Sequence, residues 1–373
     1  SKNACATCAT CGACEVMGTA NTLQCIVEAM GMCMPGSANI PAYHSEKLLL
    51  ARKSGMHIVK MVEQGLTARK IMTKEALINA LIIDLAICGS TNAALHLPAI
   101  AYNLGIDFPL SLFNEYNKKI PTLCAIAPSG PHGMLDLYKA GGTLGVMKVM
   151  RDDLNLDCIQ VYNMKISEIL EFAIVRDETV IPPRDKPFRK EGSTAALFGN
   201  LAPEGSVVKQ SAIVPEMLTY TGPARVFESE QETLAAFREK TIEDGVIIVI
   251  RNEGPKAGPG MPETLAISLA MDVSGLKSLA MITDGRFSGG TGGPCVGHIS
   301  PEAVDGGPIA AVRDGDMITI DIPNRTLSID LTDDEIKKRV AEYKAPKREI
   351  KGSFMRRYVK LVSSAAKGAV LMD

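Results

Sequence analysis

The sequence has 373 residues, of which 46% are apolar and 22% charged, and this length and balance favour a globular protein of two domains. Its net charge of −2 gives no reason to expect nucleic acid or an anionic membrane as a partner. No apolar run reaches the ~20 residues that span a bilayer. We therefore expect a location in the cytoplasm, or in the matrix of an organelle.

Cysteines dominate the start of the chain, where Cys5, Cys8, Cys11 and Cys14 follow one another with two residues between each pair. Such clustering indicates reduced thiols that bind a metal rather than disulfides. Thiolates at this spacing can reach one iron–sulfur cluster or one zinc ion, as in a ferredoxin-like electron carrier or a zinc-binding module. The alternative is a cysteine-rich loop without a metal, and the pattern does not say which thiols bind.

The first half of the chain is predicted to be rich in helices. Apolar residues at helical spacing indicate helices over 21–32, 46–64 and 74–87, the last with Thr73 as N-cap. Ser90 or Thr91 is placed to cap a further helix that runs to about residue 103. The segment 134–149, which contains two adjacent glycines, closes this region.

A proline-rich, charged segment over residues 181–187 marks the expected domain boundary. We accordingly divide the chain into domains 1–183 and 184–373.

The second half contains many short runs of β-forming residues, at 206–209, 224–227, 245–251, 279–283 and 317–322. Residues 318–331 are predicted to form a hairpin. Ser229 with Glu232, and Thr332 with Glu335, are capping boxes that each open a helix. Many short strands with few helices predict a barrel-like β domain rather than a doubly wound sheet.

Two glycine-rich loops, 251–263 and 283–294, each follow a predicted strand. Repeated glycines let a backbone approach a ligand closely and turn its amides toward an anion. The alternative is two tight connections at the rim of a barrel. Polar residues among the glycines favour a ligand site: Glu253, Glu263, Asp284, Arg286 and Ser288. The histidines are isolated in the sequence, and each is expected to be a hydrogen-bonded structural residue.

Several motifs together resemble the dihydroxy-acid dehydratase / phosphogluconate dehydratase family. The resemblance extends from about residue 3 to about residue 365, and its main motifs are Gly12-Ala13-Cys14-Glu15-Val16-Met17-Gly18-Thr19-Ala20-Asn21-Thr22, Gly89-Ser90-Thr91-Asn92, Pro259-Gly260-Met261-Pro262-Glu263, Thr283-Asp284-Gly285-Arg286-Phe287-Ser288 and Gly297-His298-Ile299-Ser300.

The resemblance implies a fold and a reaction. The fold is a helix-rich α/β N-terminal domain, truncated here, followed by a barrel-like β/α C-terminal domain of aconitase-swivel type. The reaction is dehydration of 2,3-dihydroxy-3-methylbutanoate and 2,3-dihydroxy-3-methylpentanoate to 2-keto acids, in valine and isoleucine biosynthesis. Phe287 favours these substrates over those of the sugar-acid dehydratases of the same family.

Site residues also follow from the resemblance. Cys14 matches a ligand of an iron–sulfur cluster, either [2Fe–2S] or [4Fe–4S], and Glu263 matches a ligand of Mg²⁺. Ser288 matches the catalytic base, and substrate-binding residues Gly289, Gly290 and Thr291 follow it. Cys5, Cys8 and Cys11 then need not be ligands.

Two further cluster cysteines and a metal-binding Asp-Lys pair of the family have no match in the sequence, and we expect them in an upstream segment. The chain by itself is therefore expected to be inactive. The resemblance also implies a homodimer whose partner is a small dihydroxy acid.

Overall fold

The computed structural model describes residues 12–288, 293–346 and 349–372. The chain divides into two contact units: unit 1 comprises Ser1–Ala93, Asn103–Ile106 and Glu115–Ser193, and unit 2 comprises Ala94–Tyr102, Asp107–Asn114 and Thr194–Asp373. Residues after the expected boundary at 183 still pack in unit 1. The amide of Ser193, for example, donates to the carbonyl of Leu85 at 3.1 Å.

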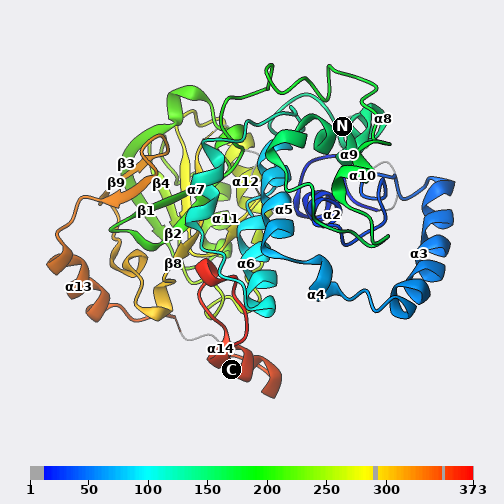
Figure 1. The fold of residues 1–373 in the computed structure, drawn as a ribbon. Helices are drawn as coiled ribbons and strands as arrows, with labels where there is room; N and C mark the ends of the chain where they lie inside the picture. The colour runs from blue at the N-terminus through cyan, green and yellow to red at the C-terminus, as the bar shows by residue number, and fades with distance from the viewer. Residues whose placement is uncertain (1–11, 289–292, 347–348, 373) are drawn as a thin grey trace. The chain divides into compact units, whose positions relative to one another are not determined.

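Helices form the regular structure of the described part of unit 1 (Figure 1): α2 (Thr19–Ala29), α3 (Ser45–Glu63), α4 (Ala68–Ile71), α5 (Lys74–Ala86), α8 (Met134–Ala140), α9 (Gly142–Val149) and α10 (Ile166–Leu170). The predicted helices over 21–32, 46–64 and 74–87 are confirmed as α2, α3 and α5. The predicted cap of α5 is also confirmed, because the Thr73 hydroxyl accepts from the amide of Ala76 at 3.3 Å.

Helix α5 is the centre of unit 1, with every residue from Ala76 to Ala86 buried. A helix that is apolar on all sides is stable only inside a core. The side chain of Asn79 on this helix accepts from the Asn155 amide at 2.7 Å and donates to the Asn155 carbonyl at 3.1 Å. These bonds satisfy a buried polar side chain that would otherwise destabilise the fold.

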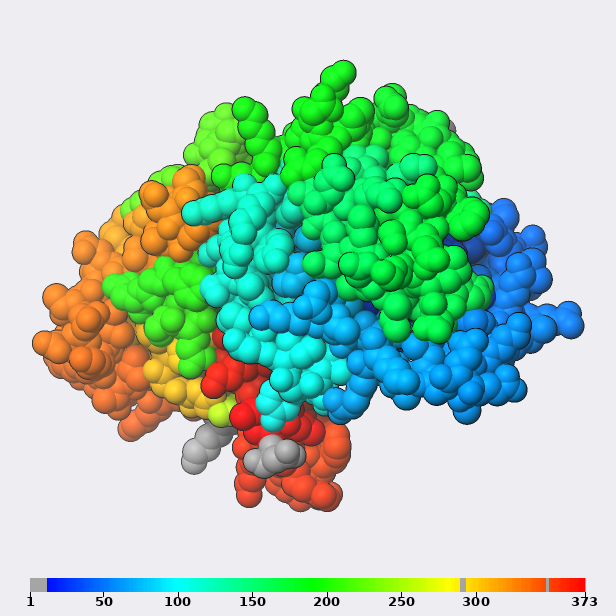
Figure 2. All heavy atoms as spheres, viewed as in Figure 1, coloured from blue at the N-terminus to red at the C-terminus, as the bar shows by residue number. Residues whose placement is uncertain are grey.

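Helix α3 has a second apolar face that the described residues leave uncovered. Met61 is buried, but Leu48 is 77% and Val62 74% exposed on the other side. Figure 1 shows α3 standing apart from α2 and α5, and in Figure 2 the blue residues of this region lie at the surface. A helix that is apolar on opposite faces usually packs on both.

The segment over 134–149 forms two helices rather than one. Gly141 separates α8 from α9 with a φ of 133°, a conformation that side chains rarely adopt. A Cβ at this position would also lie 2.3 Å from the carbonyl oxygen of Ile174.

Unit 2 is built on a closed barrel with the strand order β1-β10-β9-β3-β4-β6-β8-β2. Its strands are β1 (Ala195–Gly199), β2 (Ala202–Val208), β3 (Thr219–Phe227), β4 (Ile247–Ile250), β6 (Ala280–Thr283), β8 (Cys295–Ser300), β9 (Met317–Asp321) and β10 (Thr326–Ile329). The barrel-like β domain is thus confirmed. The predicted hairpin is β9 and β10, in which Ile320 pairs with Leu327.

Parallel strands β3, β4, β6 and β8 form one side of the barrel. Ile247 and Val249 face the barrel core, whereas Ile248 and Ile250 pack in a second cluster that includes Ile267 of α12 (Leu265–Val273). Because both faces are covered, β4 is a continuous apolar run without alternation. That run identified the strand but not its partners.

The remaining helices of unit 2 are α11 (Glu230–Glu239), α13 (Asp333–Glu342), α14 (Ser353–Leu361) and parts of α6 (Ala93–Leu104) and α7 (Ser111–Asn117). Both predicted N-caps are confirmed, since Ser229 and Thr332 accept from the amides of Glu232 and Glu335. Helix α12 was not predicted. Within the described residues no helix combines the length and the apolar character needed to cross a membrane.

Candidate functional site

Cys14 lies in a loop that leads into α2 of unit 1. The side-chain amide of Asn21 donates to the carbonyls of Cys14 and Val16, each at 2.7 Å, and so fixes the loop to the first turn of the helix. The Cys14 thiol is partly exposed. A thiol in such a position is accessible to a metal.

Two sequence motifs meet beside this loop. Thr22 of α2 accepts a hydrogen bond from the amide of Ser90 at 3.0 Å, and the side-chain amide of Asn92 donates to the Thr19 hydroxyl at 2.6 Å. The structure thus joins the motif around Cys14 to the Gly89–Asn92 segment, about 70 residues later in the chain. The sequence shows both motifs but gives no reason for their adjacency.

Two other thiols of unit 1, those of Cys25 and Cys33, are protonated in the absence of a metal. Burial raises the pKa of Cys25 to about 11 and that of Cys33 to about 12, so these thiols stay protonated at neutral pH. Cys124 is fully buried as well. Cys5, Cys8 and Cys11, by contrast, lie outside the described residues, so the four-cysteine pattern stays a prediction.

In unit 2, the two glycine-rich loops leave neighbouring parallel strands. The first follows β4 and the second follows β6, and these strands pair in register from Ile247 with Ala280 to Ile250 with Thr283. Parallel neighbours end at the same edge of a sheet, which is where α/β proteins commonly bind ligands. The loops therefore start side by side.

Buried carboxylates join the loops to each other. Asp284, in the second loop, accepts from the amides of Asn252 at 3.1 Å and Glu253 at 2.9 Å in the first, and from Ala303 at 3.0 Å. Glu302 accepts from two more amides of the first loop, at 2.8 and 3.0 Å. These amides are therefore directed to carboxylates of the protein rather than to an external anion.

The glycines here serve close packing. A Cβ at Gly285 would lie 2.6 Å from the Cβ of Glu253, and one at Gly254 would lie 2.6 Å from an oxygen of Glu302. Of the two interpretations of these loops, tight connection at the barrel rim accounts for both glycines. The polar side chains beyond them carry the case for a ligand.

Glu263 and Arg286 are directly paired by a short parallel sheet of β5 (Glu263–Thr264) and β7 (Arg286–Phe287). Thr264 and Phe287 are buried on its inner face, whereas Glu263 is exposed and Arg286 half-buried on the outer. Ser288, the next residue, is half-buried too. It directly follows the end of β7 and lies two residues from Arg286.

The two charges on this face influence each other. Partial burial raises the pKa of Glu263, and the positive charge of Arg286 opposes that rise. Burial likewise lowers the pKa of Arg286, and Glu263 opposes it. The guanidinium is held by a bond from Nε to the carbonyl of Met261 at 2.6 Å. The face therefore offers a fixed cation beside a carboxylate.

Phe287 and His298 lie directly behind this face. Phe287 is 2% exposed and packs so closely on Gly297 that a Cβ there would lie 2.6 Å from its ring. His298 is also 2% exposed, adopts a φ of 56°, and has no hydrogen-bond partner at Nε2 among the described residues. The expectation that every histidine is a hydrogen-bonded structural residue is wrong at this nitrogen.

Burial lowers the pKa of His298 to about 3, and the positive charge of Arg286 contributes to the shift. His96 of α6 is a further neighbour, and burial and Arg286 lower its pKa as well. Sequence reasoning did not bring His298, Arg286 and His96 together, because they lie apart in the chain. The only signal was that Arg286 and His298 each lie in a family-like motif.

Family models match both parts of the chain. The model described as "Dihydroxy-acid/6-phosphogluconate dehydratase N-terminal" matches residues 1–169, and the C-terminal model of the same family matches residues 179–369. The chain belongs to this dehydratase family. The predicted resemblance is thereby confirmed.

Relatives of this dehydratase chain carry one name. A protein named dihydroxy-acid dehydratase from Acetivibrio thermocellus is 49% identical over 95% of this chain and 65% of its own length. Proteins of the same name from Caldanaerobacter subterraneus subsp. tengcongensis and Thermodesulfovibrio yellowstonii are 48% and 50% identical, over 67% and 64% of their lengths. The chain spans about two-thirds of the length of these curated relatives.

Neither metal group expected for this family has a complete set of ligands in the described residues. Cys14 and Glu263 have suitable donor atoms, a thiol and a carboxylate. However, the parts of the chain that the structure describes contain no group of three or more His, Cys, Asp or Glu side chains that could hold a metal ion. Gly289, Gly290 and Thr291, the predicted substrate-binding residues, lie outside the described ranges.

The difference in exposure among cysteines predicts their reactivity. Iodoacetamide should modify Cys14 at least about tenfold faster than Cys25 or Cys124, because a buried, protonated thiol is a poor nucleophile. Peptide mass spectrometry after timed labelling measures the rates, and labelling in denaturant provides the control. Modification of Cys25 at the rate of Cys14 would contradict this arrangement.

Acid should destabilise unit 2 through His298. The unfolded chain binds a proton near the ordinary histidine pKa of about 6.5, whereas the folded chain binds it only near pH 3. Stability is thus present above the unfolded pKa and is lost as the pH falls toward the folded one.

The substitution His298→Asn removes this proton, and asparagine tolerates the positive φ. Between about pH 6.5 and 4.5 the free energy of unfolding falls in both proteins. We expect the fall to be smaller by about 1–3 kcal/mol in the variant than in the unmodified chain. Urea unfolding at both pH values measures the difference, with exposed His44→Asn as control. An equal loss in both proteins would refute the assignment.

Proposed function

We propose that this chain is part of an enzyme that dehydrates 2,3-dihydroxy-3-methylbutanoate and 2,3-dihydroxy-3-methylpentanoate to the corresponding 2-keto acids. Membership of the dehydratase family supports the reaction class. The names of the relatives, each 48–50% identical, support the substrate. The observation that carries the proposal is the β5–β7 pairing, which aligns Glu263 with Arg286, two residues before Ser288.

Ser288 is the proposed base that removes the proton from C2 of the substrate. A neutral hydroxyl is a very weak base, so Oγ can accept this proton only if positive charge stabilises its alkoxide. Arg286 lies two residues before Ser288 and is held by a hydrogen bond to the carbonyl of Met261. Its guanidinium is suited to bind the substrate carboxylate and to stabilise negative charge near Oγ.

Cys14 would hold an iron–sulfur cluster and Glu263 a Mg²⁺ ion, and these groups supply Lewis acidity for the departing hydroxyl and the developing enolate. Glu263 is exposed on this face, so its carboxylate is accessible to a cation. The remaining ligands would belong to the part of the relatives that this chain does not match.

A longer protein also accounts for the exposed face of α3. Leu48, Val59 and Val62 form an apolar surface that a further segment could bury. We include in the proposal the aconitase-swivel type of the barrel, a homodimer, and the cytoplasm or an organelle matrix as location. Sugar-acid dehydration by the same site is the alternative reaction.

A chimera tests the reaction. This chain replaces the matching two-thirds of the Acetivibrio thermocellus relative, and 2-keto acid formation is measured with 2,3-dihydroxy-3-methylbutanoate and, separately, with gluconate. We expect turnover of the first substrate only. Turnover of gluconate alone would support the sugar-acid alternative instead.

Within that chimera, Ser288→Ala should lower kcat by about 10²–10⁴-fold, the usual contribution of a general base. Cluster absorbance should be unchanged, because the serine binds no iron. Ser353→Ala, at an exposed position of unit 2, is the matched control. A kcat within about twofold of the unmodified chimera would exclude Ser288 as the base.

The chain by itself should neither retain a cluster nor turn over substrate, because Cys14 and Glu263 are single donors and no larger group of ligands surrounds them among the described residues. Anaerobic reconstitution with iron and sulfide, followed by desalting, absorbance and a keto-acid assay, tests this. The full-length relative is the positive control. A stable cluster with full activity in the chain alone would contradict the prediction.

A further inference from the structure

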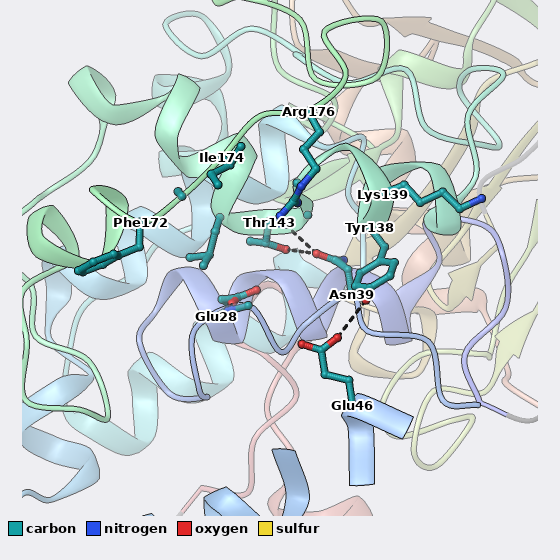
Figure 3. Close-up of a pocket in the computed structure, with 14 residues that line it drawn as sticks. Glu28, Asn39, Glu46, Tyr138, Lys139, Thr143, Phe172, Ile174 and Arg176 are labelled. Carbon is teal, nitrogen blue, oxygen red and sulfur yellow. Dashed lines mark hydrogen bonds between the residues drawn. The ribbon is translucent and has the colours of Figure 1, made fainter. Parts of the chain in front are cut away.

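Unit 1 contains a cavity of about 400 Å³ at the end of α2 away from the Cys14 loop. Its lining residues come from α2, the segment after it, the start of α3, the α8–α9 junction and the segment after α10 (Figure 3). None of them belongs to the site proposed for dehydration. The cavity is large enough for a molecule the size of an amino acid.

Glu28 forms the base of this cavity and is only 4% exposed. One carboxylate oxygen, Oε1, accepts a hydrogen bond from the amide of Gly36. This bond ties Glu28 to the segment that follows α2. The other oxygen, Oε2, has no hydrogen-bond partner among the described residues. Burial raises the pKa of Glu28 to about 7, although hydrogen bonds from the amides of Gly36, Ala38 and Ser37 and from the Thr143 side chain oppose the rise. A buried carboxylate oxygen without a donor costs free energy, so a donor from a ligand would bind there favourably.

Cationic side chains line the opposite part of the cavity. Figure 3 shows Arg176 across from Glu28, with Asn39 and Thr143 between them. Lys139 adds a second positive charge at the rim. Asn39 is already committed, since its oxygen accepts from the amide and hydroxyl of Thr143 at 2.7 and 2.8 Å. It therefore holds the wall in place.

The charges of the lining are balanced. Glu46, which accepts from the Tyr138 hydroxyl at 3.0 Å, is a second acid beside Arg176 and Lys139. Two acids and two bases line the cavity, so a simple anion or cation would leave one side unpaired. A ligand that carries both charges would satisfy both sides.

One wall is apolar. Phe172 and Ile174 line the cavity at 77% and 56% exposure, and Figure 3 shows them on the side away from Tyr138 and Lys139. Leu144 adds to this wall. Exposed aromatic and branched side chains at the edge of a cavity would be covered by an apolar group of a ligand.

We propose that this cavity binds a zwitterionic α-amino acid with an apolar side chain. The ammonium group donates to Oε2 of Glu28, the carboxylate binds Arg176, and the side chain packs on Phe172 and Ile174. The ammonium group, the carboxylate and the apolar side chain of the ligand thus each meet a part of the cavity with matching charge or polarity. The inference does not depend on the proposed dehydration.

Isothermal titration calorimetry on the whole 373-residue chain tests the proposal, with L-leucine as the probe. Two analogues separate its charges: 4-methylpentanoate lacks the ammonium group and 3-methylbutylamine lacks the carboxylate. We expect L-leucine to bind in the millimolar range or more tightly, and each analogue at least about tenfold more weakly.

Matched variants assign the contacts. Glu28→Gln and Arg176→Gln should each weaken L-leucine binding by at least about tenfold. Glu28→Gln should leave the weak binding of 4-methylpentanoate unchanged, and Arg176→Gln that of 3-methylbutylamine. Lys118→Gln removes an exposed positive charge of unit 1 outside the cavity and should bind as the unmodified chain does.

Several outcomes would overturn the proposal. Absence of heat with L-leucine, equal binding of either analogue, or unchanged binding by Arg176→Gln would each be sufficient. Arg176 is exposed, so its variant decides the question even if Glu28→Gln fails to fold. Binding needs neither cluster nor turnover, so its failure is distinguishable from failure of the dehydration.

Discussion

The position of the polar face in unit 2 depends on one buried carboxylate. Asp284 lies in the second glycine-rich loop and accepts from two amides of the first loop and from Ala303 after β8. Burial raises the pKa of Asp284, and the three amides oppose that rise by stabilising its ionised form. The carboxylate thereby replaces hydrogen bonds that these loop amides would otherwise make with water.

The hydrogen bonds of Asp284 also determine the position of the rest of the polar face. Once the loops are held together, Gly285 packs on Glu253, and the chain continues into β7, where Arg286 pairs with Glu263. Phe287 enters the interior against Gly297, whereas Arg286 is half-buried on the outer face and Ser288 directly follows the strand. Acid, cation and hydroxyl are thus placed by packing of their neighbours.

In unit 1, other contacts determine the positions of the candidate site residues. The Cys14 loop is fixed by the buried side chain of Met17 and by the hydrogen bonds from Asn21, and Thr19 and Thr22 join α2 to the segment of Ser90 and Asn92. At the other end of the same helix, Glu28 uses one oxygen to shape a loop and leaves the second facing a cavity. One helix therefore carries two polar sites at its opposite ends.

Local sequence determined what depends on near neighbours. The caps at Thr73, Ser229 and Thr332, the β9–β10 hairpin and the apolar β4 were all readable, because capping and alternation involve residues a few positions apart. The family motifs likewise identified Cys14, Glu263 and Ser288 as candidates. Their proposed chemical roles come from the family resemblance.

Tertiary structure alone decided which distant residues meet. The pairing of Glu263 with Arg286, the position of His298 behind them, and the carboxylate of Asp284 on the amides of another loop each join residues far apart in the chain. Nothing in a local pattern specifies such contacts, because they result from the order of strands around the barrel. The same holds for the two faces of α3 and for Glu28, whose burial and free oxygen exist only once separate helices pack around them.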